Sequence, residues 1–534
     1  MNTHLPTSTF QDVRQALLAR QEIALLDVRE EDPFAQAHPL FAANLPLGRL
    51  EFDAWQRIPR LDTKIVVYDN GEDLAPLAAR TLRALGYSDV SLLDGGLAGW
   101  QRAGGEVFKD VNVPSKAFGE LVEATRHTPS LGAEEVKALL DSKTDVVVLD
   151  ARRFDEYQTM SIPSGISVPG AELVLRARAL APDPATRIIV NCAGRTRSII
   201  GTQSLVNAGL PNPVAALRNG TIGWTLAGQT LVQGASRRFP AVSEAQRAEA
   251  AQGARAVAER AGVRRAHLSD LAQFAAETSR TTYRFDVRTP QEYAAGHLPG
   301  FASAPGGQLV QETDVHAPVR GARLVLADRD GVRANMSASW LAQMGWEVWV
   351  LDGAQEANFS ESGPVAPRVP EPEGALTWVS PAQVAHWLKN EPLDYTAVLD
   401  LASSATYVKR HIPSAWFVLR SELRQALAEI PPAHRYVLTC DNSALARYAA
   451  AELAHLTHSQ VVLLQGGTQG WMEAGLPLEQ GETRLACPRI DRYRRPYEGT
   501  DNPREAMQGY LDWEYGLVAQ LERDATHGFR VIGA

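Results

Sequence analysis

The sequence contains very little cysteine. Only three cysteines occur in 534 residues, namely Cys192, Cys440 and Cys487. An odd and sparse set of this kind excludes a disulfide framework and is typical of a reducing compartment, so we expect a cytoplasmic protein. No CxxC pair and no cluster of cysteine with histidine occurs, which argues against a structural zinc site.

Long apolar runs and an excess of basic charge are also missing. No stretch approaches the roughly 18 apolar residues of a membrane span, and the first twenty residues lack the pattern of a signal peptide. The net charge of −9 gives no support for nucleic-acid binding, which requires a basic patch. We therefore expect neither a membrane nor a nucleic acid among the partners.

What the sequence does contain is a unit repeated four times. Four apolar strands end in aspartate, and about 40 residues after each aspartate a second apolar strand ends. The first strands end at Asp27, Asp150, Asp286 and Asp400, and the second strands end at Asp69, Cys192, Asp328 and Cys440. Each second strand leads into a helical segment, a third strand and a glycine-containing turn. Such alternation predicts an α/β fold with small parallel sheets flanked by helices, in which ligands bind beyond the carboxyl ends of the strands.

The repeats and the segments between them divide the chain. We predict domains at 1–110, 125–232, 263–365 and 374–480, a helical linker at 233–262 and a helical C-terminal extension at 481–534. The first helices of the repeats are predicted to open at Ser8, Ser130, Ser269 and Ser380. A helix in the linker is predicted to open at Ser243, residues 362–375 are interpreted as a proline-rich linker, and a helix of the extension is predicted to start at Asn502-Pro503. The aromatic residues of the extension are interpreted as packing residues: Tyr497, Tyr510, Trp513 and Tyr515.

The second repeat carries the strongest candidate for chemistry. Its second strand ends at Cys192, and the following residues are Ala193, Gly194, Arg195, Thr196 and Arg197, which run into a helix. A helix N-terminus and two arginines favour a thiolate, and they can lower a cysteine pKa from about 8.5 to roughly 3.5–7.5. Gly194 is expected to allow a tight turn that brings the loop amides toward the sulfur. The alternative is that Cys192 is a small buried apolar residue, but two arginines would be poor neighbours in such a core.

These features resemble the rhodanese sulfurtransferase family. The resemblance rests on Asp-Val-Arg at 27–29 and 286–288, Asp-Ala-Arg at 150–152, Gly296-His297-Leu298-Pro299-Gly300, His411-Ile412-Pro413-Ser414-Ala415, and Gly-Gly-x-x-Gly-Trp at 95–100 and 466–471. It implies four tandem rhodanese-like domains and a six-residue loop, from Cys192 to Arg197, that carries the active cysteine. It also implies that Asp150 and Arg152 are structural.

The resemblance implies a mechanism of two half-reactions. The Cys192 thiolate takes the outer sulfur of a small anionic donor such as thiosulfate and forms a persulfide, which cyanide or a thiol then attacks. Residues Ala193 to Arg197 would bind the donor and stabilise the persulfide, with no metal and no organic cofactor. Two alternatives stay open, a carrier or scaffold that passes the persulfide to a partner protein and an enzyme acting on 3-mercaptopyruvate. Related phosphatases and arsenate reductases have a loop one residue longer that ends in arginine, where this chain has Ser198.

The other repeats differ at the cysteine position. Asp69 and Asp328 replace the nucleophile, so the first and third repeats are predicted to be inactive. Cys440 in the fourth repeat is a second candidate site, but its loop has neither glycine nor arginine, and Asp441 is expected to raise the thiol pKa. The alternative is that Cys440 is kept as a small apolar side chain. Cys487 has no such strand-to-helix context and is interpreted as incidental.

Overall fold

Each repeat forms a parallel sheet of five strands. The computed structural model describes residues 5–372, 374, 376–392 and 394–533, so residues 373 and 375 of the predicted proline-rich linker lie outside it. The four sheets have orders β1-β5-β4-β2-β3, β6-β10-β9-β7-β8, β11-β15-β14-β12-β13 and β16-β20-β19-β17-β18. All four therefore have the same topology, which confirms the predicted α/β fold with four repeated units.

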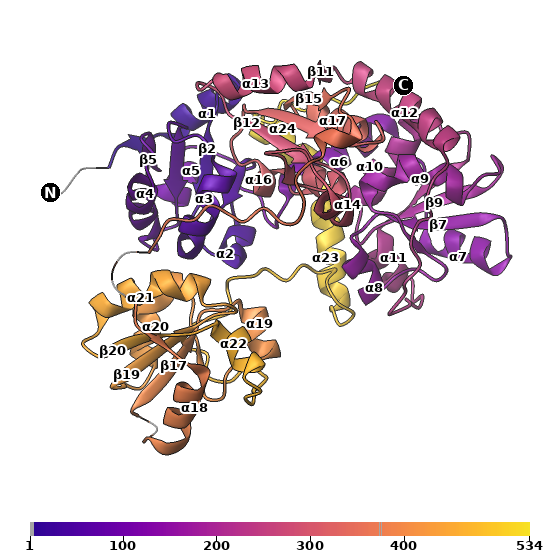
Figure 1. The fold of residues 1–534 in the computed structure, drawn as a ribbon. Helices are drawn as coiled ribbons and strands as arrows, with labels where there is room; N and C mark the ends of the chain where they lie inside the picture. The colour runs from indigo at the N-terminus through magenta and orange to yellow at the C-terminus, as the bar shows by residue number, and fades with distance from the viewer. Residues whose placement is uncertain (1–4, 373, 375, 393, 534) are drawn as a thin grey trace.

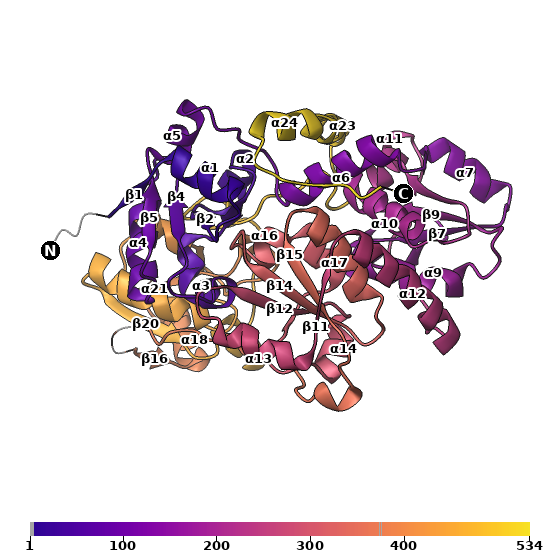
Figure 2. The same ribbon diagram turned by 90° about the horizontal axis from the view of Figure 1, so that it is seen from above.

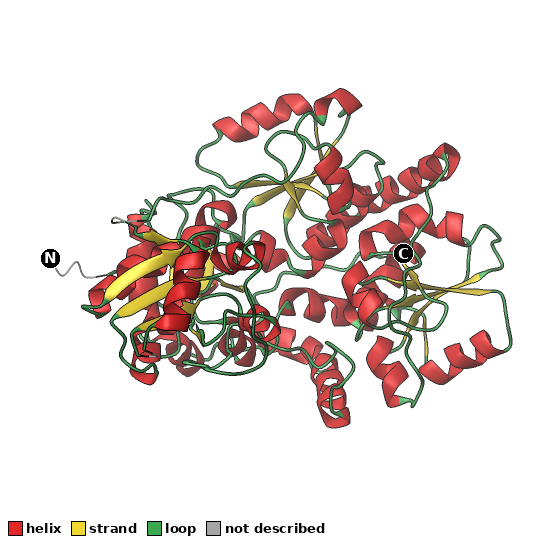
Figure 3. Cartoon of the chain, turned by 60° about the horizontal axis from the view of Figure 1, so that its bottom comes forward, coloured by secondary structure: helices red, strands yellow, loops and turns green. Residues whose placement is uncertain are grey.

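The strands of the first two sheets are β1 (Thr7–Ser8), β2 (Ala24–Asp27), β3 (Ala42–Asn44), β4 (Ile65–Tyr68), β5 (Val90–Leu93), β6 (Ser130–Leu131), β7 (Val146–Asp150), β8 (Ile166–Ser167), β9 (Arg187–Asn191) and β10 (Val214–Leu217). Those of the last two are β11 (Arg264–Ala266), β12 (Thr282–Asp286), β13 (Ala302–Ser303), β14 (Arg323–Ala327), β15 (Glu347–Leu351), β16 (Trp378–Val379), β17 (Thr396–Asp400), β18 (Trp416–Phe417), β19 (Arg435–Thr439) and β20 (Gln460–Leu464). The central strands are apolar and buried because helices cover both faces of each sheet (Figure 3).

The helices of the first two repeats are α1 (Phe10–Leu18), α2 (Glu31–Gln36), α3 (Leu50–Arg57), α4 (Leu74–Ala84), α5 (Gly96–Arg102), α7 (Ala133–Asp141), α8 (Phe154–Thr159), α9 (Leu173–Leu180), α10 (Thr196–Asn207) and α11 (Gly220–Leu226). Those of the last two are α13 (Leu268–Ala276), α14 (Pro290–Ala295), α15 (Gly306–Gln311), α16 (Thr313–His316), α17 (Arg333–Gln343), α18 (Pro381–Asn390), α19 (Ser404–Lys409), α20 (Leu423–Glu429), α21 (Ala444–Leu456) and α22 (Gly467–Glu473). Four further helices, α6 (Val113–Arg126), α12 (Glu244–Arg260), α23 (Arg504–Tyr515) and α24 (Leu517–Asp524), lie outside the repeats.

Three of the four predicted helix starts are wrong. Ser380 caps α18 as expected, but the caps of α1, α7 and α13 are Thr9, Gly132 and His267. Ser8 and Ser130 instead pair in the edge strands β1 and β6, which the sequence pattern did not reveal. The linker helix α12 does open at Ser243, whose side chain accepts the N–H of Gln246.

The Asp-x-Arg motif joins the end of the first strand to the loop after it. In the second repeat, the Arg152 guanidinium donates to the Asp150 carboxylate at 2.9 and 2.7 Å and to the carbonyl oxygen of Met160 at 2.6 Å. The same contacts recur in the first and third repeats, so the motif is structural there. The fourth repeat has Ala402 instead of arginine, and one buried oxygen of Asp400 has no hydrogen-bond partner among the described residues.

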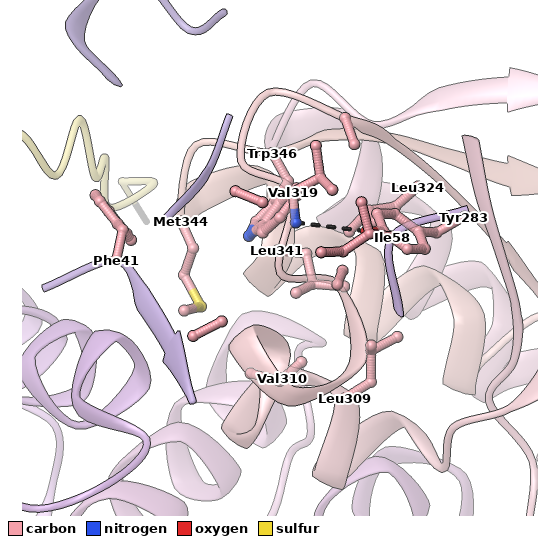
Figure 4. Close-up of a cluster of buried hydrophobic side chains, with 14 of the residues drawn as sticks. Phe41, Ile58, Tyr283, Leu309, Val310, Val319, Leu324, Leu341, Met344 and Trp346 are labelled. Carbon is pink, nitrogen blue, oxygen red and sulfur yellow. Dashed lines mark hydrogen bonds between the residues drawn. The ribbon is translucent and has the colours of Figure 1, made fainter. Parts of the chain in front are cut away.

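The repeats pack into one molecule through the helices outside them. Helix α12 packs on α9 and α17 and so spans the second and third repeats, while α6 contacts α10, α23 and α24 (Figures 1 and 2). The first and third repeats share a hydrophobic cluster (Figure 4). It contains Phe41 and Ile58 of the first repeat and Tyr283 and Leu341 of the third repeat. The fourth repeat lies beside the first repeat (Figure 1). None of the helices in the described part of the chain combines the length and hydropathy of a membrane span.

Candidate active site

The loop of residues 192–197 connects the end of β9 to the first turn of α10. The Cys192 side chain is almost completely buried, with 1% of the residue exposed, and its thiol donates to the Ser198 hydroxyl at 3.4 Å. The backbone N–H of Ser198 also points toward the sulfur. The thiol therefore lies at a helix N-terminus, the position that the sequence predicts.

The predicted fall in the Cys192 pKa is not what the structure shows. Burial raises the pKa of the Cys192 thiol, while the charge of Arg197 and the hydrogen bonds from Ser198 lower it and only partly offset the burial. The loop sequence contains the arginine and the helix start that favour a thiolate, but it does not show that the folded chain buries the thiol. Arg197 does lower the pKa of the Cys192 thiol, but desolvation of the buried thiol raises this pKa by more.

In the first and third repeats, an aspartate side chain stands at the position of the sulfur and accepts backbone N–H groups of the loop. In the first repeat the Asp69 carboxylate accepts the backbone N–H groups of Gly71 at 3.0 Å and Ala75 at 2.8 Å. In the third repeat the Asp328 carboxylate accepts those of Gly331 at 2.9 Å and Ala334 at 2.8 Å. Ala75 and Ala334 occupy the position that Ser198 occupies in the second repeat. A thiolate or persulfide of Cys192 would therefore meet an amide that binds carboxylate elsewhere in the chain.

Arg195 holds the loop in place. Its guanidinium donates to both oxygens of Glu120, at 2.7 and 2.8 Å, and to the Glu123 carboxylate. It also donates to the Asn219 side chain at 3.1 Å and to the Tyr515 hydroxyl at 2.9 Å, so all five N–H groups have an acceptor. Because a guanidinium has five donors, none is left for a substrate in this arrangement. The geometry therefore favours an anchoring role for Arg195 over the predicted role in binding the donor.

Arg197 is the arginine that acts on the sulfur. Its guanidinium pairs with both oxygens of Glu156 at 2.8 Å, and its charge favours the Cys192 thiolate. Burial alone would raise the pKa of Glu156, but Arg197 lowers it to about 2, so the pair stays ionised. Arg333 and Glu292 form the matching pair in the third repeat, which retains this part of the loop without the thiol.

A contact that the sequence did not predict is that of the C-terminal helix α23 with this loop. The buried Glu514 carboxylate accepts the Thr196 hydroxyl at 3.3 Å and the Tyr510 hydroxyl at 2.9 Å, and its other oxygen has no partner among the described residues. Burial and the charge of Glu120 raise the pKa of Glu514 to about 8. Ala193 packs against Tyr510 in the same small cluster, so α23 covers the loop.

Gly194 is required for a reason other than the predicted tight turn. Its φ does not lie in the left-handed region. A Cβ at this position would instead meet Tyr510 Cε1 at 3.0 Å and Glu514 Oε2 at 3.1 Å. Glycine therefore permits the close approach of α23.

The aromatic residues of the extension surround a buried lysine. The Lys116 ammonium lies 5.5, 5.2 and 5.5 Å from the ring centres of Tyr497, Tyr510 and Trp513, respectively. It also forms an ion pair with the Asp110 carboxylate at 2.7 Å. These contacts support the interpretation of the aromatic residues as packing residues. Tyr515 contributes differently, because its ring lies under the Arg195 guanidinium at 4.1 Å.

A cavity of about 500 Å³ adjoins the loop at Arg197. Arg152 and Glu156 of the second repeat, Glu312 of the third repeat and Arg495 of the extension line it. Residues from separate parts of the chain therefore form this cavity, which reaches the loop at Arg197 and is not lined by Cys192 itself. Within the described residues, no group of three His, Cys, Asp or Glu side chains is placed to hold a metal ion.

The two other cysteines lie in the fourth repeat. Cys440 is 5% exposed and lines a cavity of about 670 Å³ between the fourth and the first repeat. Burial raises its pKa, whereas the backbone N–H groups of Ala446, Leu445 and Asn442 lower it. Cys487 packs in the core of the fourth repeat, where burial raises its pKa to about 12.

Comparison with known proteins identifies the family to which the chain belongs. The sequence profile of the Rhodanese-like domain matches residues 9–103, 132–227, 270–357 and 380–474. The crystal structure of thiosulfate sulfurtransferase from Pseudomonas aeruginosa is 69% identical in sequence and has a TM-score of 0.97, over 99% of this chain and 100% of that one.

Two other matches are partial. The Alr3790 protein from Anabaena sp. is 29% identical over 20% of this chain and 84% of its own, with a TM-score of 0.19. An uncharacterized protein, slr1261, from Synechocystis sp. is 32% identical over 114 residues, which are 21% of this chain and 60% of that protein. The four matched segments of the family profile make up most of the chain, and the protein therefore belongs to the rhodanese family.

Proposed function

We propose that the chain is a sulfurtransferase that moves a sulfane sulfur from thiosulfate, or a similar small anionic donor, to cyanide or a thiol. The observation that carries the proposal is the position of Cys192 at the N-terminus of α10, beside the Ser198 amide and Arg197. In the first and third repeats, aspartate carboxylates accept the equivalent amides. The name of the 69% identical protein, thiosulfate sulfurtransferase, supports the same donor.

The proposed reaction has two steps through one covalent intermediate. The Cys192 thiol first loses its proton, and the thiolate attacks the outer sulfur of thiosulfate. The S–S bond of the donor breaks, sulfite leaves with the bonding electrons, and a persulfide remains on Cys192. Cyanide or a thiolate then attacks the terminal sulfur, and the Cys192 thiolate is released. The Ser198 amide and the Arg197 charge stabilise the anionic sulfur in both steps.

The burial of Cys192 sets a condition on this reaction. A donor can reach the sulfur only if the loop or its cover moves, and the cavity lined by Arg197 and Arg495 offers space for an anion beside the loop. A persulfide held in this environment would also be protected from water and from adventitious thiols. The second candidate function, a carrier that delivers the persulfide to a partner protein, is favoured by the same burial.

The experiment that tests the proposal is intact-mass measurement after incubation with thiosulfate. We expect a gain of one sulfur atom that is absent in Cys192→Ala and present in Cys440→Ala. Full sulfur transfer by Cys192→Ala would refute the proposal. Addition of cyanide to the loaded protein then separates the two candidates, because an enzyme turns over and forms thiocyanate continuously, whereas a carrier releases little until its partner protein is added.

A further inference from the structure

A second cavity, which Cys192 does not line, has five arginines among its sixteen lining residues. It has a volume of about 510 Å³ and lies where the end of α1, the end of α12, the start of β11 and residues 530–532 meet. Figure 1 shows the C-terminal end of the chain beside α12. Arginines from four segments of the chain line this arginine cavity: Arg20, Arg260, Arg264, Arg280 and Arg530. It shares no lining residue with the cavity at Arg197.

Glu347 is the one acidic residue among the lining residues of the arginine cavity. It pairs with Arg264 at 3.2 Å and with Arg280 at 2.7 Å, and it also faces the neighbouring Arg323 at 3.5 Å. Arg260 donates to the carbonyl oxygen of Asn207, which carries no charge. Positive charge therefore exceeds negative charge here, although the chain as a whole has a net charge of −9.

Two of the five arginines have no partner in the described part of the chain. The side chains of Arg20 and Arg530 make no hydrogen bond and no ion pair with the described residues, although both line the cavity. Like charges gathered in this way repel one another, and the repulsion falls when an anion enters.

The aromatic wall of the arginine cavity carries a further unused donor. Trp346, which belongs to the hydrophobic cluster in Figure 4, lines the cavity and is 7% exposed. Its indole N–H is buried and has no hydrogen-bond partner among the described residues. The Arg320 guanidinium lies 4.5 Å from the Trp346 ring centre and has no carboxylate partner there either. A buried donor without an acceptor is unfavourable, so this N–H adds to the groups around the cavity that lack a partner in the described part of the chain.

We propose that the arginine cavity binds a small phosphorylated metabolite. Guanidinium groups bind phosphate through paired hydrogen bonds, and arginines on several sides of the cavity suit a ligand with more than one negative charge. The volume lies within the range of roughly 300–1,000 Å³ that is usual for small-molecule sites, and it exceeds the needs of a single inorganic anion. Val531 and Ile532, which are partly exposed and line the cavity, provide an apolar surface for the uncharged part of the ligand.

The test measures binding of three probes to the full chain by isothermal titration calorimetry at low salt: inorganic pyrophosphate, ADP and citrate. We expect saturable binding of pyrophosphate and ADP, at one site per chain, and binding that weakens as salt is added. The double variant Arg260→Ala/Arg530→Ala should weaken binding by at least about tenfold, because two charge-assisted contacts are lost. Arg247→Ala is the matched control, since Arg247 is exposed on α12 and does not line the cavity.

Further controls separate this site from the sulfur-transfer site and from a folding defect. Cys192→Ala should bind ADP as the unaltered protein does, and thiosulfate should not displace ADP. The double variant should melt at the temperature of the unaltered protein without ligand and should lose only the stabilisation that ADP adds. The proposal is overturned if no phosphate probe binds saturably, if the double variant binds unchanged, or if thiosulfate displaces ADP. Binding of citrate without binding of pyrophosphate or ADP would overturn the preference for phosphate.

Discussion

At the scale of single residues, Arg197 is the fixed charge that favours the Cys192 thiolate against the effect of burial. We predict that Arg197→Gln raises the thiol pKa by roughly one unit, because a nearby positive charge stabilises the ionised form. The measurement is the rate of iodoacetamide alkylation of Cys192 against pH, whose midpoint should move to higher pH. Sulfur loading from thiosulfate at neutral pH should slow.

Two comparison variants make this prediction specific. Arg197→Lys keeps the charge and should retain most of the effect, although it loses the bidentate contact with Glu156. Arg153→Gln removes a half-exposed arginine from the wall of the same cavity and should leave the midpoint unchanged. If Arg153→Gln and Arg197→Gln moved the pH midpoint of Cys192 alkylation equally, the total charge of the cavity, and not Arg197 in particular, would control the thiol pKa.

The candidate nucleophile could be predicted from the sequence, but its surroundings could not. Spacing and strand ends are local patterns, and they were enough to place Cys192 between a parallel strand and a helix. The contact between Thr196 and Glu514 joins residues 318 positions apart, and no local pattern announces it. The predicted direction of the Cys192 pKa was wrong because the thiol is buried in the folded chain, and a local pattern does not show how deeply a residue is buried.

At the scale of elements, the approach of α23 to the loop depends on Gly194. We predict that Gly194→Ala reduces sulfur transfer strongly, because the added methyl group would lie 3.0 Å from Tyr510 and 3.1 Å from Glu514. Either α23 or the loop must then shift. The measurement is the steady-state rate with thiosulfate and cyanide, together with thermal unfolding.

Gly509→Ala is the matched control for this substitution. Gly509 lies within α23, where a Cβ would meet nothing within 4 Å. Alanine should stabilise the helix there by about 0.5–1 kcal/mol and leave the rate unchanged. If Gly194→Ala were as active and as stable as Gly509→Ala, the close packing of α23 on the loop would not be required.

The same helix carries a buried acid that links stability to pH. The pKa of Glu514 is raised from its ordinary value of 4.5 to about 8, with Glu120, Lys116, Arg195 and Tyr510 around it. The folded chain therefore holds a proton that the unfolded chain releases between these values, and stability falls as pH rises through this window. We predict that Glu514→Gln, which stays neutral, gains stability relative to the unaltered protein as pH rises.

The measurement is urea unfolding of both proteins at about pH 5 and about pH 9. The difference in free energy of unfolding should be small at the lower pH and should reach the order of a few kcal/mol in favour of Glu514→Gln at the higher pH. Glu505→Gln, on the exposed first turn of the same helix, should show no such dependence. If the difference in free energy of unfolding between Glu514→Gln and the unaltered protein stayed constant across this pH range, Glu514 would be ionised throughout it.

At the scale of the whole molecule, the repeats are joined by buried ion pairs as well as by helices. Arg333 of the third repeat pairs with Glu172 of the second at 2.7 Å, and both side chains are buried. Arg420 of the fourth repeat pairs with both oxygens of Glu51 in the first at 2.7 Å. The first and third repeats, which have aspartate at the cysteine position, are thus joined by ion pairs to the two cysteine-bearing repeats.

The contact between the fourth and first repeats borders the cavity that Cys440 lines. Arg420 lines the cavity that contains this cysteine, and its removal would leave Glu51 without its partner. Loss of one member of a buried pair costs roughly 3–5 kcal/mol, so we predict that Arg420→Ala loosens this interface. Alkylation of Cys440, followed by mass spectrometry of the labelled peptide, should then become faster.

Sulfur loading at Cys192 shows whether Arg420→Ala loosens only the interface between the fourth and first repeats or destabilises the whole chain. The 192–197 loop makes hydrogen bonds with α6 and α23, and none with the described residues of the fourth repeat, so sulfur loading from thiosulfate should be unchanged in Arg420→Ala. Arg424→Ala, on the exposed side of α20, should change neither quantity. Faster alkylation at both cysteines would indicate that the whole chain has been destabilised. Unchanged alkylation at Cys440 would mean that the Arg420 pair does not hold this interface closed, and that the fourth repeat is positioned by the apolar contact of Phe52 with Tyr448 instead.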